Sequence, residues 1–274
     1  MLTRPLLALT LLVTGATQSA DVDLTPVQRS FELLSPEQRG LAIFTEADKR
    51  NSGYGDLEVE LKMILRTAKG AATERNLRIR QMEVPADGDR VLIVFDTPAD
   101  IRGTALLSHA HKVDSDDKWL FLPALKRVKK IASRNKSGAF LGSEFSFEDL
   151  ALPELEKYSY RYLREDSHQG VDCYVVERRS KEQYSGYAKE HYWLDKEEYR
   201  TLRVDYFDRR DNQVKLLKVE DYQLYNETFW KPGRMLMENL RTKKSTELVW
   251  HDYNFAAGFN ADRDFSVNSL RRAR

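Results

Sequence analysis

The sequence predicts a mostly β protein built on a single curled antiparallel sheet, with helices at its N-terminus and a long helical connection as a lid. Short apolar segments with a period of two recur along most of the chain, as they do in strands that bury one face. Turn-rich pieces such as "ADGD", "DSDD", "DKEE" and "DRRDNQ" separate these segments. No Pro/Ser-rich linker and no internal repeat divides the 274 residues, so we expect one domain.

The first twenty residues, "MLTRPLLALTLLVTGATQSA", are typical of a secretory signal peptide. Arg4 is followed by a short apolar stretch and then by small and polar residues. This stretch is too short to span a bilayer, and no later segment is apolar enough to give a stable membrane span. We therefore expect export, cleavage near Asp21 and a mature domain over residues 21–274. The single cysteine, Cys173, excludes an intramolecular disulfide, so the fold must depend on its core.

Two helices are predicted after the signal peptide, over residues 25–34 and 35–51. Each begins with a hydroxyl residue followed by proline, which is the pairing expected at a helix start. Ser35 and Gln38 also have the spacing of a capping box. The second helix should end near Asn51, where "NSGYGD" supplies two glycines and a turn.

The period changes to two after this turn. In "DLEVELKMILRT" five apolar residues fall on one side of a strand and charged residues on the other: Leu57, Val59, Leu61, Met63 and Leu65. Twelve further segments have the character of strands: 76–84, 90–98, 104–113, 117–122, 126–132, 158–165, 171–179, 190–195, 200–208, 214–224, 234–240 and 245–255. A meander of this length closes or curls, and we expect its concave apolar face to be covered by the N-terminal helices.

Residues 136–157, "KSGAFLGSEFSFEDLALPELEK", interrupt the strand pattern. Glycines, two prolines nearby and clustered aromatic residues predict a long connection with short helical pieces. Connections of this length inside a compact domain are usually functional.

No motif predicts catalysis. The chain has no Gly-x-Ser-x-Gly element, phosphate loop or dinucleotide fingerprint. His109 and His111 lie on one side of a strand beside "DSDD", but without a clear third ligand we interpret them as surface polar positions. We therefore expect no enzyme, no catalytic residue, no metal and no cofactor. A hydrolase is kept as a minor alternative, which would need a nucleophile and a base within hydrogen-bond reach. The net charge of +1 gives no global field to attract nucleic acid, so no nucleic-acid partner is expected.

Four stretches in a fixed order resemble a known family: "SGYGDLEVELKMIL", "FDTPADIRGTALL", "DDKWLFLPALKRVKKIA" and "NKSGAFLGSEFSFEDL". The chain is similar, from about residue 36 to the C-terminus, to the LolA-like family of outer-membrane lipoprotein-sorting proteins, in the longer branch associated with exporters of the resistance-nodulation-division (RND) type. The resemblance implies a periplasmic half-open barrel of antiparallel strands with a helical lid and a cavity for acyl chains.

On this resemblance we expect a periplasmic carrier or acceptor that binds a lipid or lipidated protein and passes it across the envelope. The alternative is a non-carrier accessory protein of an RND-type transporter of the inner membrane, which would then be a partner. A filled concave face would favour the accessory protein. The apolar residues expected to line the cavity are Leu61, Met63, Leu65, Leu77, Ile79, Ile93, Phe95, Leu107, Trp119, Phe121, Phe140 and Phe145.

The stretch "WLFLPALKRVKKI", residues 119–131, predicts a hairpin at the rim of that cavity. Its "PAL" forms the turn, and four cations follow: Lys126, Arg127, Lys129 and Lys130. These cations could meet lipid phosphate, an acidic partner protein, or the acidic residues Glu144, Glu148 and Asp149. A solvated strand face explains them equally well, so all four interpretations stay open at this stage.

Overall fold

The computed structural model describes residues 31–150 and 154–272. The chain divides into two units, Met1–Leu34 and Ser35–Arg274. The predicted signal peptide and most of the predicted first helix, 25–34, lie outside the described residues. All the elements named below belong to Ser35–Arg274. No helix in the described part of the chain has both the length and the apolar character needed to cross a membrane.

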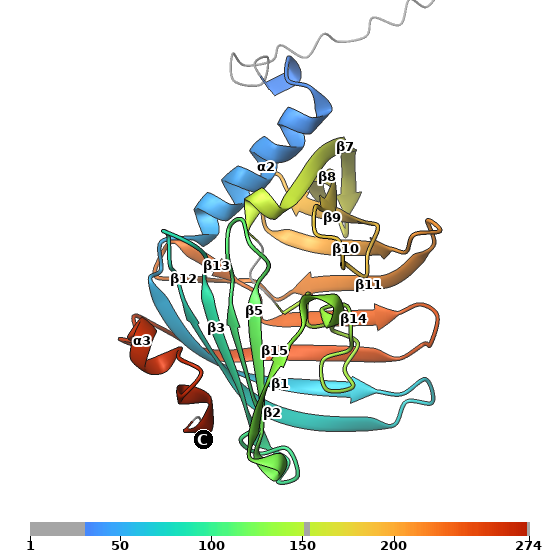
Figure 1. The fold of residues 1–274 in the computed structure, drawn as a ribbon. Coiled ribbons are helices and arrows are strands. Elements are labelled where there is room, and N and C mark those ends of the chain that lie inside the picture. Colours follow the sequence, from blue (N-terminus) through green and yellow to red (C-terminus); the bar gives the residue numbers. More distant parts are fainter. Residues whose placement is uncertain (1–30, 151–153, 273–274) are drawn as a thin grey trace, which may run out of the picture. The chain divides into compact units, whose positions relative to one another are not determined.

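In the described part of the chain, 13 strands form one open antiparallel sheet (Figure 1). Their order is β6-β5-β4-β3-β2-β1-β15-β14-β11-β10-β9-β8-β7, so β6 and β7 are the free edges. The strands are β1 (Asp56–Arg66), β2 (Ala72–Met82), β3 (Arg90–Thr97), β4 (Ala105–His109), β5 (Asp117–Leu122), β6 (Arg127–Ile131), β7 (Tyr158–His168), β8 (Val171–Ser180), β9 (Lys189–Asp195), β10 (Thr201–Phe207), β11 (Gln213–Glu220), β14 (Arg234–Asn239) and β15 (Ser245–Phe255).

The remaining elements are short, except for one helix. A separate ladder pairs β12 (Gln223–Tyr225) with β13 (Phe229–Lys231). The helices are α2 (Pro36–Asn51), α3 (Ala261–Asp264), η1 (Pro123–Leu125), η2 (Ser133–Asn135), η3 (Leu155–Lys157) and η4 (Ser269–Arg271). The mostly β fold with one unclosed antiparallel sheet, predicted from the period of two, is confirmed.

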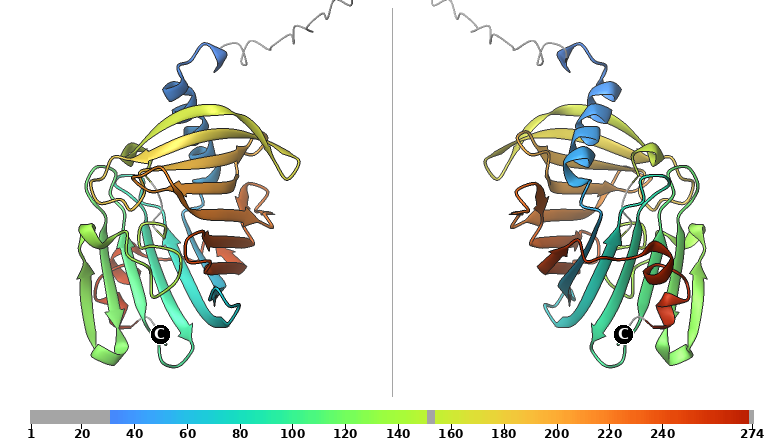
Figure 2. Two further views of the ribbon diagram at one scale, coloured as in Figure 1. Left: turned by 90° about the vertical axis from the view of Figure 1, so that its right-hand side faces the viewer. Right: turned by 90° about the vertical axis from the view of Figure 1, so that its left-hand side faces the viewer.

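The sheet has an inner face that is bent around α2 and around residues 132–150 of the connection between β6 and β7 (Figure 2). Residues directly opposite each other in antiparallel strands lie on the same face, so the register Leu61↔Leu77, Leu77↔Phe95 and Ile93↔Leu106 follows this inner face from β1 to β4. On the other half of the sheet, Val204↔Tyr192 and Arg178↔Tyr160 continue it to β7. The alternation that was read from the sequence thus forms one continuous inner face across both halves of the sheet.

The connection between β6 and β7 fills part of this inner face. Phe140 and Phe145 are buried, and the Phe140 ring lies 5.7 Å from that of Phe95 on β3. Polar contacts fix the connection to both halves of the sheet, because Arg75 Nη1 donates to Leu141 O (2.8 Å) and Lys215 Nζ donates to Glu144 O (2.7 Å). The concave face is therefore filled beside β1–β3.

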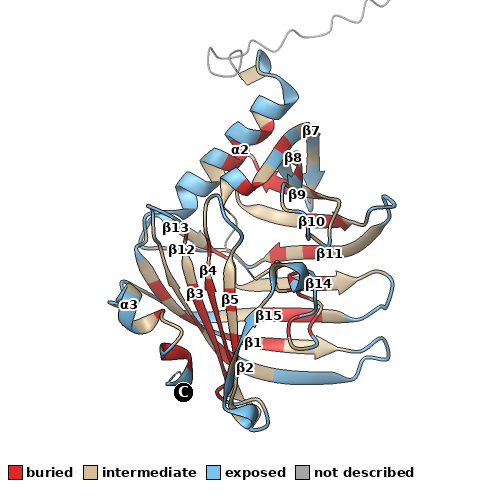
Figure 3. Cartoon of the chain, viewed as in Figure 1, coloured by how far each residue is buried: buried red, intermediate tan, exposed pale blue. Residues whose placement is uncertain are grey.

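The opposite face of β3–β6 is also covered. Phe265 and Leu270 of the C-terminal segment are fully buried against Leu92, Val94 and Leu107. Arg90 Nη1 donates to Ala261 O (3.0 Å), and the His109 ring hydrogen-bonds Phe265 O (2.7 Å). The sequence pattern predicted strands that bury one face and expose the other. This prediction is wrong for β3 and β4, which are buried on both sides (Figure 3).

Helix α2 begins at the capping box predicted from the sequence. Gln38 N donates to Ser35 Oγ (3.2 Å), and Ser35 N donates to Gln38 Oε1 (2.9 Å). The helix packs on β7 to β9 through Phe44, whose ring lies 4.6 Å from Tyr160 and 5.2 Å from Tyr192. Gly40 allows this approach, because a Cβ there would lie 2.8 Å from the backbone nitrogens of Arg161 and Tyr162.

Gly40→Ala should destabilise the protein by about 1–3 kcal/mol, although alanine is the better helix former by roughly 0.8–1.0 kcal/mol. The added methyl group meets backbone atoms of β7 that cannot rotate away, so α2 or β7 must shift. Urea denaturation would measure the change in the free energy of unfolding. The matched control is Thr45→Ala on the exposed side of α2, which should be neutral or stabilising. Equal stability of both variants would contradict the close packing of α2 on β7.

Candidate functional site

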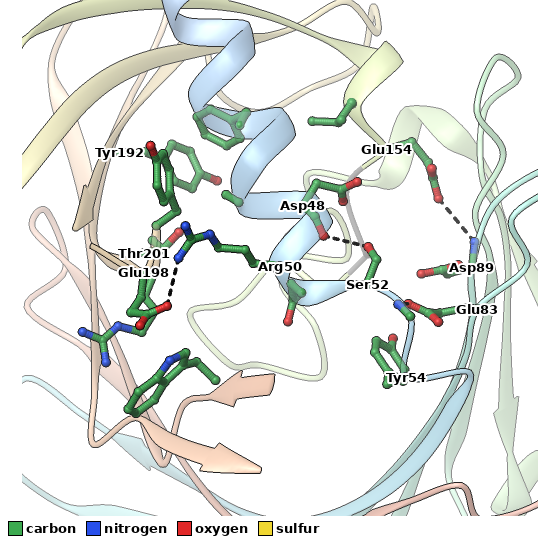
Figure 4. A pocket seen from close by; sticks show the side chains of 18 of the residues that line it. Asp48, Arg50, Ser52, Tyr54, Glu83, Asp89, Glu154, Tyr192, Glu198 and Thr201 are labelled. Carbon is green, nitrogen blue, oxygen red and sulfur yellow. Dashed lines mark hydrogen bonds and ion pairs between the residues drawn. The ribbon is translucent and has the colours of Figure 1, made fainter. Parts of the chain in front are cut away.

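A cavity of about 520 Å³ opens at the C-terminal end of α2. Its lining comes from α2, the loop before β1, the β2–β3 turn, the β9–β10 turn and single residues of other segments: Lys112, Glu154, Leu155, Tyr160, Arg178, Tyr192, Tyr222 and Trp230. Figure 4 shows two walls: Arg50, Tyr192, Glu198 and Thr201 on one side, and Tyr54, Glu83, Asp89 and Glu154 on the other. The cavity is thus the hollow part of a concave face that is filled elsewhere.

The first wall is aromatic and carries cations that already have partners. Arg50 Nη1 donates to Glu198 Oε2 (2.9 Å) and to Glu197 O (2.8 Å). The Arg200 guanidinium lies 4.5 Å from the Trp230 ring centre, and its Nε donates to Asp195 Oδ2 (2.7 Å). This wall offers aromatic surface without a free positive charge.

The second wall carries carboxylates. Glu83 is held by Gly53 N (2.8 Å) and Gly55 N (2.7 Å), whose positive φ angles turn both amides toward it. Within the described residues, no Lys or Arg forms an ion pair with Asp89 or Glu154. Burial raises the pKa of both carboxyl groups, and neighbouring negative charges raise it further, from Glu83 for Asp89 and from Asp89 for Glu154.

A buried lysine lies behind this wall. Lys231 on β13 is 7% exposed, and its Nζ donates to Asn51 Oδ1 (2.6 Å) and lies 4.5 Å from the Tyr54 ring centre. Burial lowers the pKa of Lys231 to about 8, against the opposing charges of Glu83 and Asp89. Lys231 therefore contacts both Asn51, at the end of α2, and Tyr54, which lines the cavity.

Glu154→Gln should raise the melting temperature at pH 7 by a few degrees or less, because it removes a carboxylate that burial disfavours. The glutamine keeps an oxygen to accept from Asp89 N, as Glu154 Oε1 does at 3.3 Å. The folded-state pKa of Glu154 is raised, so the stability that it contributes is complete below its ordinary pKa of 4.5 and is lost as the pH rises through the folded-state value. The advantage of the variant should therefore disappear below about pH 4.

Glu46→Gln on α2 is the control with the opposite sign. The hydrogen bond from Arg50 Nε (2.7 Å) lowers the pKa of Glu46, so its stability contribution is present at neutral pH and is lost on acidification. This variant should be less stable than the parent at pH 7 and equal to it at low pH. If the two variants showed the same pH dependence of the melting temperature, the electrostatic description of the second wall would be wrong.

None of the twelve apolar residues predicted to line a cavity lies on this one. Nine of them belong to the inner face or to the connection on it: Leu61, Met63, Leu65, Leu77, Ile79, Ile93, Phe95, Phe140 and Phe145. Leu107, Trp119 and Phe121 lie on the opposite face, packed with the C-terminal segment. The structure thus places nine of the twelve predicted residues together and the other three on the opposite face of the sheet. Contact of any of the twelve with a ligand stays a prediction.

The four predicted cations are exposed on or beside the edge strand β6, in the hairpin expected from "PAL". Lys130 pairs with Asp117 (2.6 Å) and lies 5.6 Å from the Trp119 ring centre. Among the described residues, Lys126, Arg127 and Lys129 form no ion pair. The acidic residues of the connection have other partners: Glu144 binds Asn239, Glu148 binds Ser185, Gly186 and Lys136, and Asp149 binds Ser146, Tyr187 and Lys215. Within the described chain, the four cations therefore form no ion pair with these acidic residues of the connection.

Most of the residues that line the cavity were missed because they come from the end of α2, from turns, from strand ends and from short segments outside the long strands. Tyr160, Arg178 and Tyr192 are the exceptions, within β7, β8 and β9. Tyr222 directly precedes β12, Trp230 lies on the short strand β13, Asp89 directly precedes β3, and Glu154 directly precedes η3. The hydrophobic period of two identifies the middle of a strand and does not identify residues at its ends or in turns. Neither histidine nor cysteine is among the described residues that line the cavity, so these residues offer no imidazole or thiol to act as base or nucleophile.

Comparison with known proteins gives the family. A family model described as an uncharacterized protein matches residues 87–272, and no curated protein matches. The chain is 43% identical to a domain from Vibrio parahaemolyticus described provisionally as an outer membrane lipoprotein-sorting protein, with a TM-score of 0.84 over 86% of this chain and 100% of that one. It is 28% identical to a DUF1329 family protein from Desulfovibrio piger, with a TM-score of 0.81 over 86% and 100% of the two chains. A LolA superfamily protein from Nitrosomonas europaea has the same fold at 18% identity, with a TM-score of 0.67 over 86% and 99%. The chain therefore belongs to the LolA-like family.

Proposed function

We propose that this protein is a periplasmic carrier or acceptor that shields part of a lipid, or of a lipidated protein, in the cavity beside α2. The single observation that carries the proposal is this hollow of about 520 Å³ in a LolA-like sheet. Ligand pockets commonly measure about 300–1,000 Å³, so the hollow has room for one small ligand or one part of a larger one. Its aromatic wall supplies apolar surface, and each Å² of that surface removed from water stabilises a complex by roughly 25 cal/mol.

Native mass spectrometry of protein purified without detergent, followed by uptake of a fluorescent fatty-acyl probe by the delipidated protein, tests the proposal. We expect co-purified lipid or saturable uptake. Trp230→Ala should weaken uptake, because the ring belongs to the aromatic wall. Tyr184→Ala removes an aromatic ring that is 46% exposed elsewhere, and it should leave uptake unchanged. Absence of both lipid and saturable uptake would exclude the carrier.

The alternative, a non-carrier accessory protein of an RND-type transporter, has one observation in its favour. The inner face beside β1–β3 is covered by Phe140 and Phe145, which are buried there, and a filled concave face is what the accessory protein predicts. An accessory protein would bind its transporter and take up no acyl probe. The uptake experiment therefore separates the two candidates.

We also infer that Lys126, Arg127, Lys129 and Lys130 contact an anionic headgroup or an acidic partner. Replacing all four with glutamine should weaken that binding and reduce its salt dependence, since exposed charges are screened over about 10 Å at 0.1 M salt. The melting temperature should hardly change, because exposed ion pairs contribute at most about 1 kcal/mol. Binding to anionic vesicles and to the candidate partner, each at low and high salt, separates the two ligands. Parent-like binding in every condition would leave the basic run as a solvated strand face.

A further inference from the structure

The charged residues on the outer face of β1 differ in their partners. Three form ion pairs: Glu58 with Arg80 (2.8 Å), Lys62 with Glu74 (3.3 Å) and Arg66 with Glu247 (2.6 Å). Asp56 accepts a hydrogen bond from Gly258 N (3.1 Å). Within the described chain no Lys or Arg forms an ion pair with Glu60. Arg78 lies opposite Glu60 in the register, but its guanidinium donates both Nε (2.9 Å) and Nη2 (2.7 Å) to Asp96.

A β-bulge brings two further polar side chains to Glu60. The register of β1 with β15 shifts between Glu58↔Asn254 and Glu60↔His251, so Asp252 and Tyr253 lie opposite the single residue Val59. Neighbouring residues of a regular strand point to opposite faces. Asp252 has a φ of 55°, in the left-handed region, and this break lets the side chains of His251 and Asp252 reach the same side as Glu60.

The three side chains form a compact donor set. Their ligand atoms, one imidazole nitrogen and two carboxylate oxygens, all lie within 4.8 Å of one another, and His251 Nε2 is 4.0 Å from Glu60 Oε2. All three are exposed, so rotation of the side chains can close the set around an ion without moving the sheet. Two carboxylates repel each other when nothing positive lies between them, and a dication would remove that repulsion.

We propose that Glu60, His251 and Asp252 bind a divalent transition-metal ion of the zinc type. Zn²⁺ accepts imidazole nitrogen and carboxylate oxygen at about 2.0–2.2 Å, and sites with three protein ligands keep a fourth position for water. The ion would join β1 to β15 across the bulge, near the middle of the sheet. This site lies on the outer face and is independent of the cavity and of the proposed carrier function.

Isothermal titration of the tag-free protein with Zn²⁺, together with visible absorption of its Co²⁺ complex, tests the site. We expect one saturable equivalent per chain and a melting temperature that rises with metal concentration. His251→Ala should abolish saturable binding. Glu60→Gln and Asp252→Asn should each weaken it at least about tenfold, since even loss of an outer-sphere partner of a metal ligand costs that much. Asparagine tolerates the left-handed backbone, so Asp252→Asn should keep the bulge.

Two matched controls make the result specific. Glu58→Gln, two residues away on the same face, should bind Zn²⁺ like the parent. His111→Ala tests the other histidine between carboxylates, where Asp87 lies 2.7 Å from Nδ1 and Asp117 lies 3.7 Å from Nε2, on different sides of the ring. The proposal is overturned if Zn²⁺ shows no saturable binding, if binding survives His251→Ala, or if His111→Ala abolishes it. None of these outcomes bears on the carrier function.

Discussion

Replacing Arg178 by methionine should destabilise the protein by about 3–5 kcal/mol, because it leaves the carboxylate of Glu190 buried without a counter-charge. The two residues lie opposite each other on β8 and β9, at 7% and 8% exposure, with Arg178 Nε 2.6 Å from Glu190 Oε2. The guanidinium also lies 4.0 Å from the Tyr158 ring centre and 4.5 Å from that of Tyr192. It therefore holds the aromatic residues under α2 as well as the carboxylate.

Urea denaturation of three further variants would show that the buried charge is the cause. Arg178→Met combined with Glu190→Leu should recover most of the loss, since a buried ion pair can often be exchanged for apolar residues of similar volume. Glu190→Leu alone should be costly, because it leaves the cation buried. Arg179→Met removes the neighbouring arginine, which is half exposed on the opposite face, and should cost no more than about 1 kcal/mol. Equal losses for Arg178→Met and Arg179→Met would contradict the argument.

The sequence contained enough to predict the sheet and its family. Alternation in "DLEVELKMILR" placed Leu57, Val59, Leu61 and Met63 on one face, and all four are buried on the inner face of β1. The capping box at Ser35 and the hairpin turn at "PAL" depend on interactions within a few residues, so local pattern was sufficient there. These elements are specified by neighbours in sequence.

The cavity and the second covered face depend on contacts between distant segments. Leu107, Trp119 and Phe121 have the same alternation as the inner residues, and only the C-terminal residues Phe265 and Leu270 decide what covers them. Glu154 and Asp89 are 65 residues apart in sequence and meet on one wall through a hydrogen bond. Single-sequence periodicity contains no information on such pairings, which explains why it found the inner face but missed the hollow.

Phe140→Ala should also cost about 3–5 kcal/mol, the loss expected for truncating a fully buried phenylalanine. Phe140 is 0% exposed, and its ring lies 5.7 Å from Phe95 and 5.6 Å from Phe147. The backbone of the connection should stay in place, because Phe140 N donates to Phe145 O (2.8 Å) and Glu144 N donates to Thr246 Oγ1 (2.9 Å). The substitution should therefore leave an apolar hole on the inner face and keep the connection attached.

Such a hole also tests whether the inner face can accept an acyl chain. Apolar cavities made by truncation stay dry and bind apolar ligands, so uptake of the fatty-acyl probe per folded molecule should rise in Phe140→Ala. Leu125→Ala, at a position 62% exposed on the β5–β6 turn, is the control and should change neither stability nor uptake. A loss below about 1 kcal/mol would show that Phe140 is not packed as described, since burial alone requires more. A full loss of stability with unchanged uptake would restrict any acyl chain to the cavity beside α2.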